Sequence, residues 1–584
     1  MLEPRISKRE KKLQLNYELP TCIHCSAIYP IPAPNGSDVI IYGHERGIRV
    51  IWRGGRRRKQ RANPPKTNGA SNEVILLDSD DEGQQNQDEA PKAQDQYEDT
   101  EDDEDPDCSY PPIIQEVDLE HGSPVLSIAV PAITPAAISQ LPQYAQTHII
   151  VTQACANGGI VVTAIGLQPP TEAEKRNGSF QIDEEWLAEG GSIARSLAVR
   201  ISHNQEHHHG CQILVATAGE NLSLWSVAVS QRRSNPKRLL HQPRSTFKVA
   251  FPSSRSQGHL LTSERSGAVR MLDHTENRLA DGRPESRGSA SGPTSGNQAP
   301  GRWFMSYCTP FHSSSGGHSL ARRKNILDTA WVLSARAILV LLEDGEWGVW
   351  DMRGASSGNK SPEEFALHGY LGASSSTELA EAGKQKKGGA RLAPMTPNTR
   401  RTKSENLFSG PEKVQGVAPS GGISVSPINT RSGAVDESIV MWYNNEIYSI
   451  TSMQTFWQRS SNPTNSASGF GSLYTPGLTH ITDINLMNEN ITSISQFASR
   501  STSSSTGQMN VPRDILVSTE SRFIILQHQA SPTAKRGLFQ QVAQQPTMQD
   551  QRMLDAGELD LGGMDRLLDG MATGGRTRKV GFAN

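Results

Sequence analysis

The feature that most constrains the fold is a hairpin pattern that occurs seven times along the 584-residue chain. Each copy has an apolar, β-branched run, a short turn rich in Gly, Asn, Asp, Glu or Ser, and a second run in which apolar and polar residues alternate. Alternation with a period of two on both sides of such a turn is typical of a β-hairpin. The copies span residues 39–52, 148–165, 212–227, 259–273, 337–352, 438–453 and 514–528. The chain is therefore predicted to be all-β.

The segments between the hairpins favour a propeller over a sandwich or a barrel. An apolar segment precedes each hairpin, and a further candidate strand follows several of them, for example at 113–119 and 302–307. Three to four strands per unit is the content of a propeller blade. Trp52, Trp225 and Trp350 each lie near the end of a hairpin's second run, as in WD-type repeats. These observations predict a seven-bladed WD-type β-propeller with long disordered insertions.

A segment near the N-terminus is predicted to close the ring. Residues 12–19 (KLQLNYEL) alternate like a strand but have no hairpin before them. Radial repetition removes exposed sheet edges only if the ring closes. We therefore expect residues 12–19 to supply the outer strand of the seventh blade.

Composition indicates that much of the chain lies outside the blades. Only 35% of the residues are hydrophobic and 6% are aromatic, too few to offset the entropy of ordering the whole backbone. Aperiodic stretches rich in Gly, Ser, Pro or charged residues predict disordered insertions at about 53–111, 274–300, 354–420, 455–475 and 499–512. The predicted domains are the propeller over residues 1–530 and a C-terminal extension over residues 531–584.

The net charge of −3 conceals two opposed blocks. Residues 53–61 hold six basic side chains, and residues 78–107 hold fifteen acidic ones. Blocks of like charge stay solvated and usually serve as interaction tails. The six cysteines are too sparse for a disulfide framework, and neither a signal peptide nor a bilayer-spanning apolar run occurs. We therefore expect a soluble, intracellular protein without membrane insertion.

One short motif lies at the start of the acidic block. The aliphatic residues Val74, Ile75, Leu76 and Leu77 are followed by Asp78, Ser79, Asp80, Asp81 and Glu82, an arrangement that resembles a SUMO-interaction motif. Such a segment adds a strand to a sheet edge, and its acidic flank contacts a basic surface. SUMO is therefore a candidate partner. The alternatives are a stray aliphatic run and a strand of the blade itself.

The C-terminal extension carries a second candidate site. Within residues 549–571, Leu561, Met564, Leu568 and Met571 recur at helical spacing, with Leu567 beside them. This stretch is a candidate amphipathic helix that docks in a partner's groove. It could instead pack on the propeller or stay disordered, because Gly562 and Gly563 disfavour a helix.

The search for chemistry-bearing motifs predicts no catalytic residue, no cofactor and no metal site. Cys22 and Cys25 form a CxxC pair, but no second pair has zinc-ligand spacing, and buried core thiols are the favoured interpretation. No phosphate-binding loop, nucleophile elbow or HExxH motif occurs, so we do not expect an enzyme. The basic cluster at 56–59 lacks interleaved aromatic residues, which favours a targeting signal or solvated loop over a specific nucleic-acid site.

Two parts of the chain resemble a known family. They are the opening blade, LPTCIHCSAIYPI (19–31) with VIIYGHERGIRVIWRGGRRRKQ (39–60), and the tail segments GGMDRLLDGM (562–571) and RTRKVGFAN (576–584). The arrangement resembles a fungal version of the small propeller nucleoporin in the Y-shaped outer-ring complex of the nuclear pore, the thirty-seven-kilodalton class in animals. The resemblance covers the propeller and, loosely, the C-terminal extension.

The resemblance implies a non-catalytic scaffold in the nucleus, at the nuclear pore complex of the nuclear envelope. Its partners would be other scaffold nucleoporins, first the long β-propeller/α-helical subunit in an arm of the Y. It would support pore assembly, protein import and messenger RNA export. The alternative is a nuclear WD-repeat adaptor of a chromatin or ubiquitin-ligase complex. Trp350-Asp351, followed by Met352 and Arg353, suggests that class at one blade only.

Overall fold

The structure is a computed structural model in which strands dominate. It describes residues 3–9, 12–56, 110–202, 211–229, 236–252, 258–274, 301–312, 322–352, 364–372, 418–429, 435–461, 477–482, 484–498 and 513–528. The chain divides into two compact units, Met1–Gln529 and Ala530–Asn584, and the second unit lies outside the described residues.

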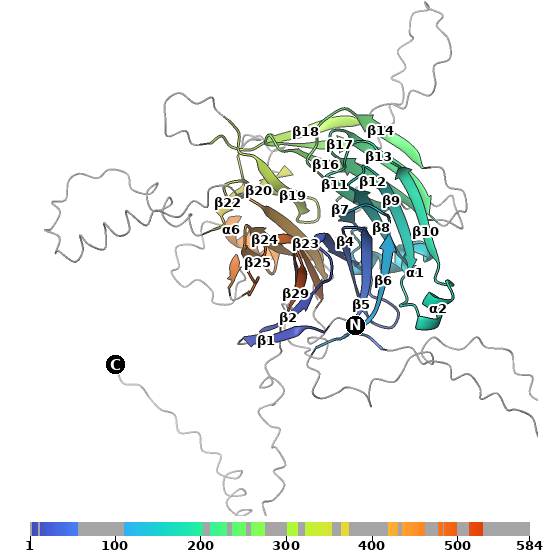
Figure 1. Cartoon of the computed structure of the whole chain (residues 1–584). Coiled ribbons are helices and arrows are strands. Elements are labelled where there is room, and N and C mark those ends of the chain that lie inside the picture. Colours follow the sequence, from blue (N-terminus) through green and yellow to red (C-terminus); the bar gives the residue numbers. More distant parts are fainter. Residues whose placement is uncertain are drawn as a thin grey trace, which may run out of the picture. The chain divides into compact units, whose positions relative to one another are not determined.

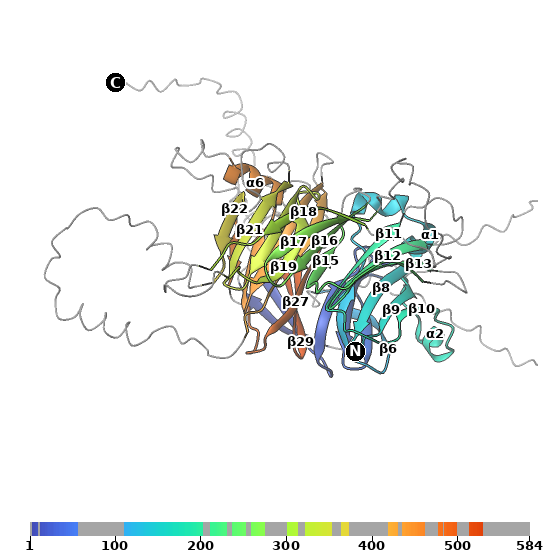
Figure 2. The same ribbon diagram turned by 90° about the horizontal axis from the view of Figure 1, so that it is seen from above.

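The first unit is a β-propeller of seven antiparallel sheets, which confirms the predicted fold (Figures 1 and 2). Within blades one to six, each strand pairs with the strand before it in the chain. Blade one contains β3 (Ile23–Ile28), β4 (Asp38–His44), β5 (Gly47–Arg53) and β6 (Ile113–Glu120). Blade two contains β7 (Val125–Ala129), β8 (His148–Cys155), β9 (Ile160–Gly166) and β10 (Ile182–Ala188). Blade three contains β11 (Ser196–Ser202), β12 (Cys211–Ala218), β13 (Leu222–Val229) and β14 (Lys237–Gln242).

The remaining blades repeat this arrangement, except that the last one recruits the N-terminus. Blade four contains β15 (Lys248–Ala250), β16 (His259–Glu264), β17 (Ala268–Asp273) and β18 (Arg302–Cys308). Blade five contains β19 (Ile326–Val332), β20 (Ala337–Leu342), β21 (Glu346–Asp351) and β22 (Leu367–Tyr370). Blade six contains β23 (Gly421–Asn429), β24 (Val435–Tyr443), β25 (Glu446–Ile450) and β26 (Thr479–Ile481). Blade seven has the order β1 (Arg5–Arg9), β2 (Lys12–Glu18), β29 (Arg522–His528), β28 (Arg513–Thr519) and β27 (Ile491–Ala498).

Short helices lie in the connections between strands. In the described part of the chain they are the 3₁₀ helix η2 (Pro135–Gln140) and the α-helices α1 (Gln143–Thr147), α2 (Glu172–Arg176) and α6 (Met453–Ser461). None of the helices that the structure describes is long and apolar enough to cross a membrane.

The core lies between the blades, which explains the strength of the hairpin pattern. All residues of β20, a middle strand, are buried, because a middle strand has a neighbouring blade on each face. Two of the tryptophans that the sequence analysis singled out contact a neighbouring blade. The Nε1–H of Trp52 in β5 donates to the carbonyl oxygen of Leu167, after β9, at 2.9 Å. The ring of Trp350 in β21 stacks on Tyr307 in β18, with centroids 5.3 Å apart.

Polar contacts also join neighbouring blades along their first strands. Ser26 in β3 hydrogen bonds to Ser493 in β27 at 2.8 Å, across the joint between blades one and seven. Asp328 in β19 pairs with Lys248 in β15 at 2.9 Å and accepts from the backbone N–H of Ile423 in β23, also at 2.9 Å. One carboxylate therefore contacts blades four and six from blade five.

The structure corrects three of the predicted boundaries. The segment 354–420, predicted as a disordered insertion, contains β22. The sequence does not predict this strand because its four residues, LHGY, are too few to show an alternating pattern. The segment 455–475 begins within α6, whose first turn is held by Asp436 and Ser452 through hydrogen bonds to the N–H groups of Gln454 and Thr455. The insertion predicted at 53–111 is narrower, because residues 53–56 and 110–111 are described as part of blade one and its flanks.

Candidate functional site

The seam that closes the ring, the pairing of β2 with β29, joins segments from the two ends of the propeller sequence. Strand β2 pairs with β29 from Lys12 opposite His528 to Glu18 opposite Arg522. This confirms that the N-terminal segment belongs to the seventh blade. Strand β2 is not the outermost strand, however, because β1 pairs along its other side. The extra strand escaped prediction because its sequence, RISKR, is charged and carries a single large apolar residue, Ile6.

Apolar packing holds one face of the seam. Leu13, Leu15 and Tyr17 are buried in a cluster that also contains Ile40 and Ile51 of blade one. The ring of Tyr17 stacks on Phe523 of β29 with centroids 4.6 Å apart. Since burying one such side chain stabilises by about 1.5–3 kcal/mol, this face supplies much of the free energy that holds β2 in place.

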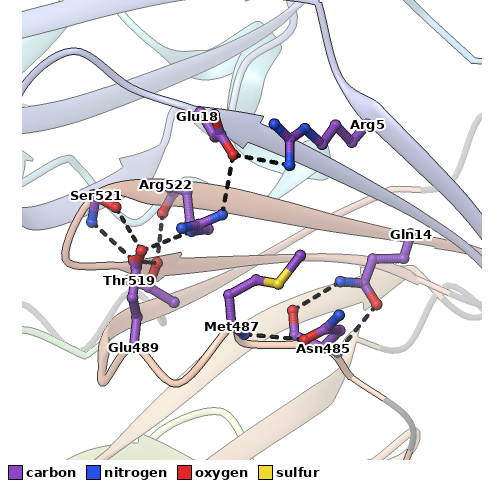
Figure 3. Close-up of polar contacts among 9 residues, drawn as sticks. All are labelled: Arg5, Gln14, Glu18, Asn485, Met487, Glu489, Thr519, Ser521 and Arg522. Atoms are coloured by element: carbon purple, nitrogen blue, oxygen red, sulfur yellow. Dashed lines mark hydrogen bonds and ion pairs between the residues drawn. The ribbon is translucent and has the colours of Figure 1, made fainter.

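A polar cluster around Glu489 lies at the end of the seam, beside the turn between β28 and β29 (Figure 3). The carboxylate accepts hydrogen bonds from the backbone N–H of Ser521 at 3.0 Å, its hydroxyl at 2.5 Å, the hydroxyl of Thr519 at 2.6 Å and Nε of Arg522 at 2.7 Å. Desolvation alone would raise the pKa of Glu489, but these hydrogen bonds outweigh it and lower the pKa to about 2. Glu489 is therefore a charged acceptor that fixes the turn between β28 and β29.

Arg522 extends this cluster to the N-terminal strands. Its Nη1 lies 3.4 Å from a carboxylate oxygen of Glu18, and Nη1 of Arg5 lies 3.4 Å from the same oxygen (Figure 3). The chain Glu489–Arg522–Glu18–Arg5 thus crosses three strands, β29, β2 and β1. Its outer end is open to solvent, since the Arg5 side chain is 72% exposed, so this pair contributes little to stability.

The loop before β27 makes a second polar contact with β2. Gln14 donates through Nε2 to the carbonyl oxygen of Asn485 at 3.1 Å and accepts from the backbone N–H of the same residue at 3.3 Å (Figure 3). The side chain of Asn485 accepts from the backbone N–H of Met487 at 3.1 Å. Met487 and Asn488 have φ of 53° and 63°, a left-handed conformation that this turn stabilises locally.

The outer edge of blade seven is the most accessible part of this region. We define it as the outward side of β1, residues Arg5–Arg9. Arg5, Ser7 and Lys8 are exposed, Lys12 is exposed at the start of β2, and Ile6 is 50% exposed. An unpaired strand edge can bind another extended segment through its backbone. This edge is therefore suited to binding an extended protein segment.

The described residues contain no group of three or more His, Cys, Asp or Glu side chains that could hold a metal ion. The two cysteines of the CxxC pair have different environments. Cys22 is exposed, so the prediction of two buried thiols is wrong for this residue. Cys25 donates from Sγ to the carbonyl oxygen of Val125 at 3.6 Å. Burial raises the pKa of the Cys25 thiol to about 12, so this thiol is a poor nucleophile.

Both site predictions from the sequence concern residues outside the described part of the chain. These are the motif at Val74–Leu77 with its acidic flank, and the helical set around Leu561–Met571. The seam residues were missed because nothing local marks them. Gln14 and Asn485, for example, are 471 positions apart in the chain.

Comparisons with known proteins relate the chain to a nucleoporin family. The family model described as the nucleoporin NUP37 N-terminal domain matches residues 16–526. Nucleoporin NUP37 of Chaetomium thermophilum is 30% identical over 509 residues, and the match covers 75% of this chain and 65% of that protein. Among solved structures, Chaetomium thermophilum Sqt1 bound to the N-terminus of the ribosomal protein L10 is similar with 12% identity and a TM-score of 0.31, over 68% of this chain and 69% of that chain.

The family match begins in β2 and ends in β29, so it spans all seven blades and includes the seam that closes them. It confirms the resemblance to a fungal nucleoporin of this class. The chain belongs to the nucleoporin NUP37 family, whose place is the nuclear pore complex at the nuclear envelope.

Proposed function

We propose that the chain is a non-enzymatic scaffold subunit of the outer ring of the nuclear pore complex. In this role it supports pore assembly, protein import and messenger RNA export through protein–protein contacts. The observation that carries the proposal is the family match over residues 16–526, which reaches all seven blades. The match covers less than two thirds of the Chaetomium relative, so the proposal concerns the propeller as a binding platform.

The way charged groups are used in the described residues supports a structural role. Lys324 pairs at 2.6 Å with both Asp344 and Glu346, and Glu489 has its carboxylate occupied by three neighbouring residues. Catalytic acids and bases need a partly unpaired group within reach of a substrate. In these two clusters the charges instead hold turns within a blade.

The partner proposed is the long β-propeller/α-helical subunit in an arm of the Y-shaped complex. The alternative, a nuclear WD-repeat adaptor of a chromatin or ubiquitin-ligase complex, has no support from the family match. The helix predicted within residues 549–571 remains a candidate second contact with the partner, separate from the propeller.

The test is reconstitution with the purified arm subunit, followed by sedimentation and cross-linking mass spectrometry. We expect a one-to-one complex with the full chain, and cross-links on the propeller. A matched chain that ends at residue 530 separates the propeller from the extension: equal affinity assigns the contact to the blades. A full chain that stays monomeric with the arm subunit, and that recovers cullins or histones from nuclear extract, would overturn the scaffold proposal.

A further inference from the structure

The outer edge of blade seven is an open strand edge with a positive charge. Among the described residues β1 pairs with β2 alone and is the last strand of its sheet. Proteins usually cover or shorten such an edge because its unpaired N–H and C=O groups recruit other strands. We propose that this edge binds residues 73–82 of the same chain, the aliphatic segment with the acidic flank, as an added β-strand.

Charge complementarity is the first argument for this occupant. Arg5 and Lys8 on β1 and Lys12 on β2 are exposed, and the segment carries Asp78, Asp80, Asp81 and Glu82 directly after its aliphatic run. A strand added to β1 brings these opposite charges within a few ångströms, where they attract even near water. A second copy of β1 itself is disfavoured as the occupant, because it would place like charges opposite one another.

Apolar contact is the second argument. Paired residues of an antiparallel ladder lie on the same face, so Ile6 lies on the face of Leu15. Ile6 is half exposed there. An extended segment with four consecutive aliphatic residues offers two of them to that face, and these cover Ile6 while the backbone pairs with β1.

The position of the chain ends is the third argument. Tyr110, the first described residue after the segment, packs against the same cluster as Leu13 and Leu15 of β2. The backbone N–H of Gly54, two residues before the last described residue ahead of this stretch, donates to the carbonyl oxygen of Pro112 at 2.7 Å. Both ends of residues 57–109 therefore leave the propeller from one place, beside the seam.

The length of chain between these ends makes the edge easy to reach. Residues 57–72 can extend up to about 50 Å and residues 83–109 up to about 90 Å, at about 3.3 Å per residue. Tethering of this kind gives an effective concentration in the millimolar range. Even a weak intrinsic affinity of the segment for β1 therefore suffices to fill the edge in the intact chain.

The experiment uses a fluorescent peptide of residues 70–85, the full chain and a chain that lacks residues 70–85. We expect the peptide to bind the shortened chain. Its affinity for the full chain should be lower by at least about tenfold, because the tethered copy competes. Lys8→Glu in the shortened chain should abolish binding. Lys237→Glu on β14, an exposed cation on the outer strand of blade three, is the matched control and should leave binding unchanged. Thermal melts verify that each variant folds.

Three outcomes would overturn the proposal. The first is no binding of the peptide to the shortened chain. The second is equal binding to the shortened and full chains, which would mean that the tethered segment leaves the edge open. The third is a full chain that binds SUMO as tightly as the free peptide does, which would assign the segment to SUMO instead. A peptide with the aliphatic residues replaced by Ser and the acids retained should fail to bind, since charge alone does not form a strand.

Discussion

The carboxylate of Glu437, in β24 of blade six, accepts a hydrogen bond at 2.9 Å from the backbone N–H of Ser334, in the turn that ends β19 of blade five. It accepts a second one from Leu333 at 2.6 Å. Leu333, Ser334 and Ala335 have φ of 56°, 55° and 64°, and left-handed backbone costs an L-residue roughly 1 kcal/mol. A buried carboxylate from the next blade therefore stabilises a strained turn.

Removing this carboxylate should destabilise the propeller. Glu437→Ala removes the acceptor of two backbone N–H groups in a partly exposed turn, and we expect a loss of about 1–3 kcal/mol in the free energy of unfolding. Glu437→Gln keeps one carbonyl oxygen as acceptor and should lose about 1 kcal/mol. Chemical denaturation of both variants measures the difference. Equal stability of Glu437→Ala and the unchanged chain would show that the turn does not depend on blade six.

The seam should make stability depend on pH through Glu489. Its pKa in the folded chain is lowered to about 2, against an ordinary value of 4.5. A carboxyl with a depressed folded pKa contributes stability that is complete above the unfolded pKa and is lost as the pH falls from 4.5 toward 2. Glu489→Gln should therefore cost about 2 kcal/mol at pH 7. The difference from the unchanged chain should shrink steadily below pH 4.5 in denaturation curves, and a constant difference across that window would contradict the assignment.

Asp328 should contribute more to the stability of the propeller than its ion-pair partner Lys248. Its carboxylate is buried and contacts the backbone N–H of Ile423 as well as Lys248. Asp328→Ala breaks contacts with two neighbouring blades and should cost about 3 kcal/mol. Lys248→Met removes only a partly exposed ion pair and should cost about 1 kcal/mol or less. If the two variants lose equal stability in chemical denaturation, the hydrogen bond from Ile423 in blade six does not contribute measurably to stability.

The parts of the fold that could be predicted are those that repeat locally. The middle strands of each blade are buried on both faces, so β4, β5 and β20 show their pattern in a short window of sequence. The outer strand β22 and the edge strand β1 are short or charged and show no such pattern. Arg522 contacts both Glu489 and Glu18, which lie far apart in the sequence. No local sequence pattern therefore marks this cluster.

The N-terminal strands allow a graded test of ring closure. Deleting residues 1–9 removes β1, in which the side chains of residues 5–8 are exposed, and should cost roughly 1 kcal/mol, a shift of a few degrees in Tm. Deleting residues 1–20 also removes the buried Leu13, Leu15 and Tyr17 and leaves β29 as an edge strand that pairs only with β28. At about 1.5–3 kcal/mol for each buried side chain, we expect this deletion to lower Tm by more than about 10 °C or to prevent folding. Leu15→Ala in the full chain, with an expected loss of about 2–5 kcal/mol, separates lost packing from lost strand pairing. A melt of the 1–20 deletion that matches the 1–9 deletion would show that β2 does not hold the ring closed.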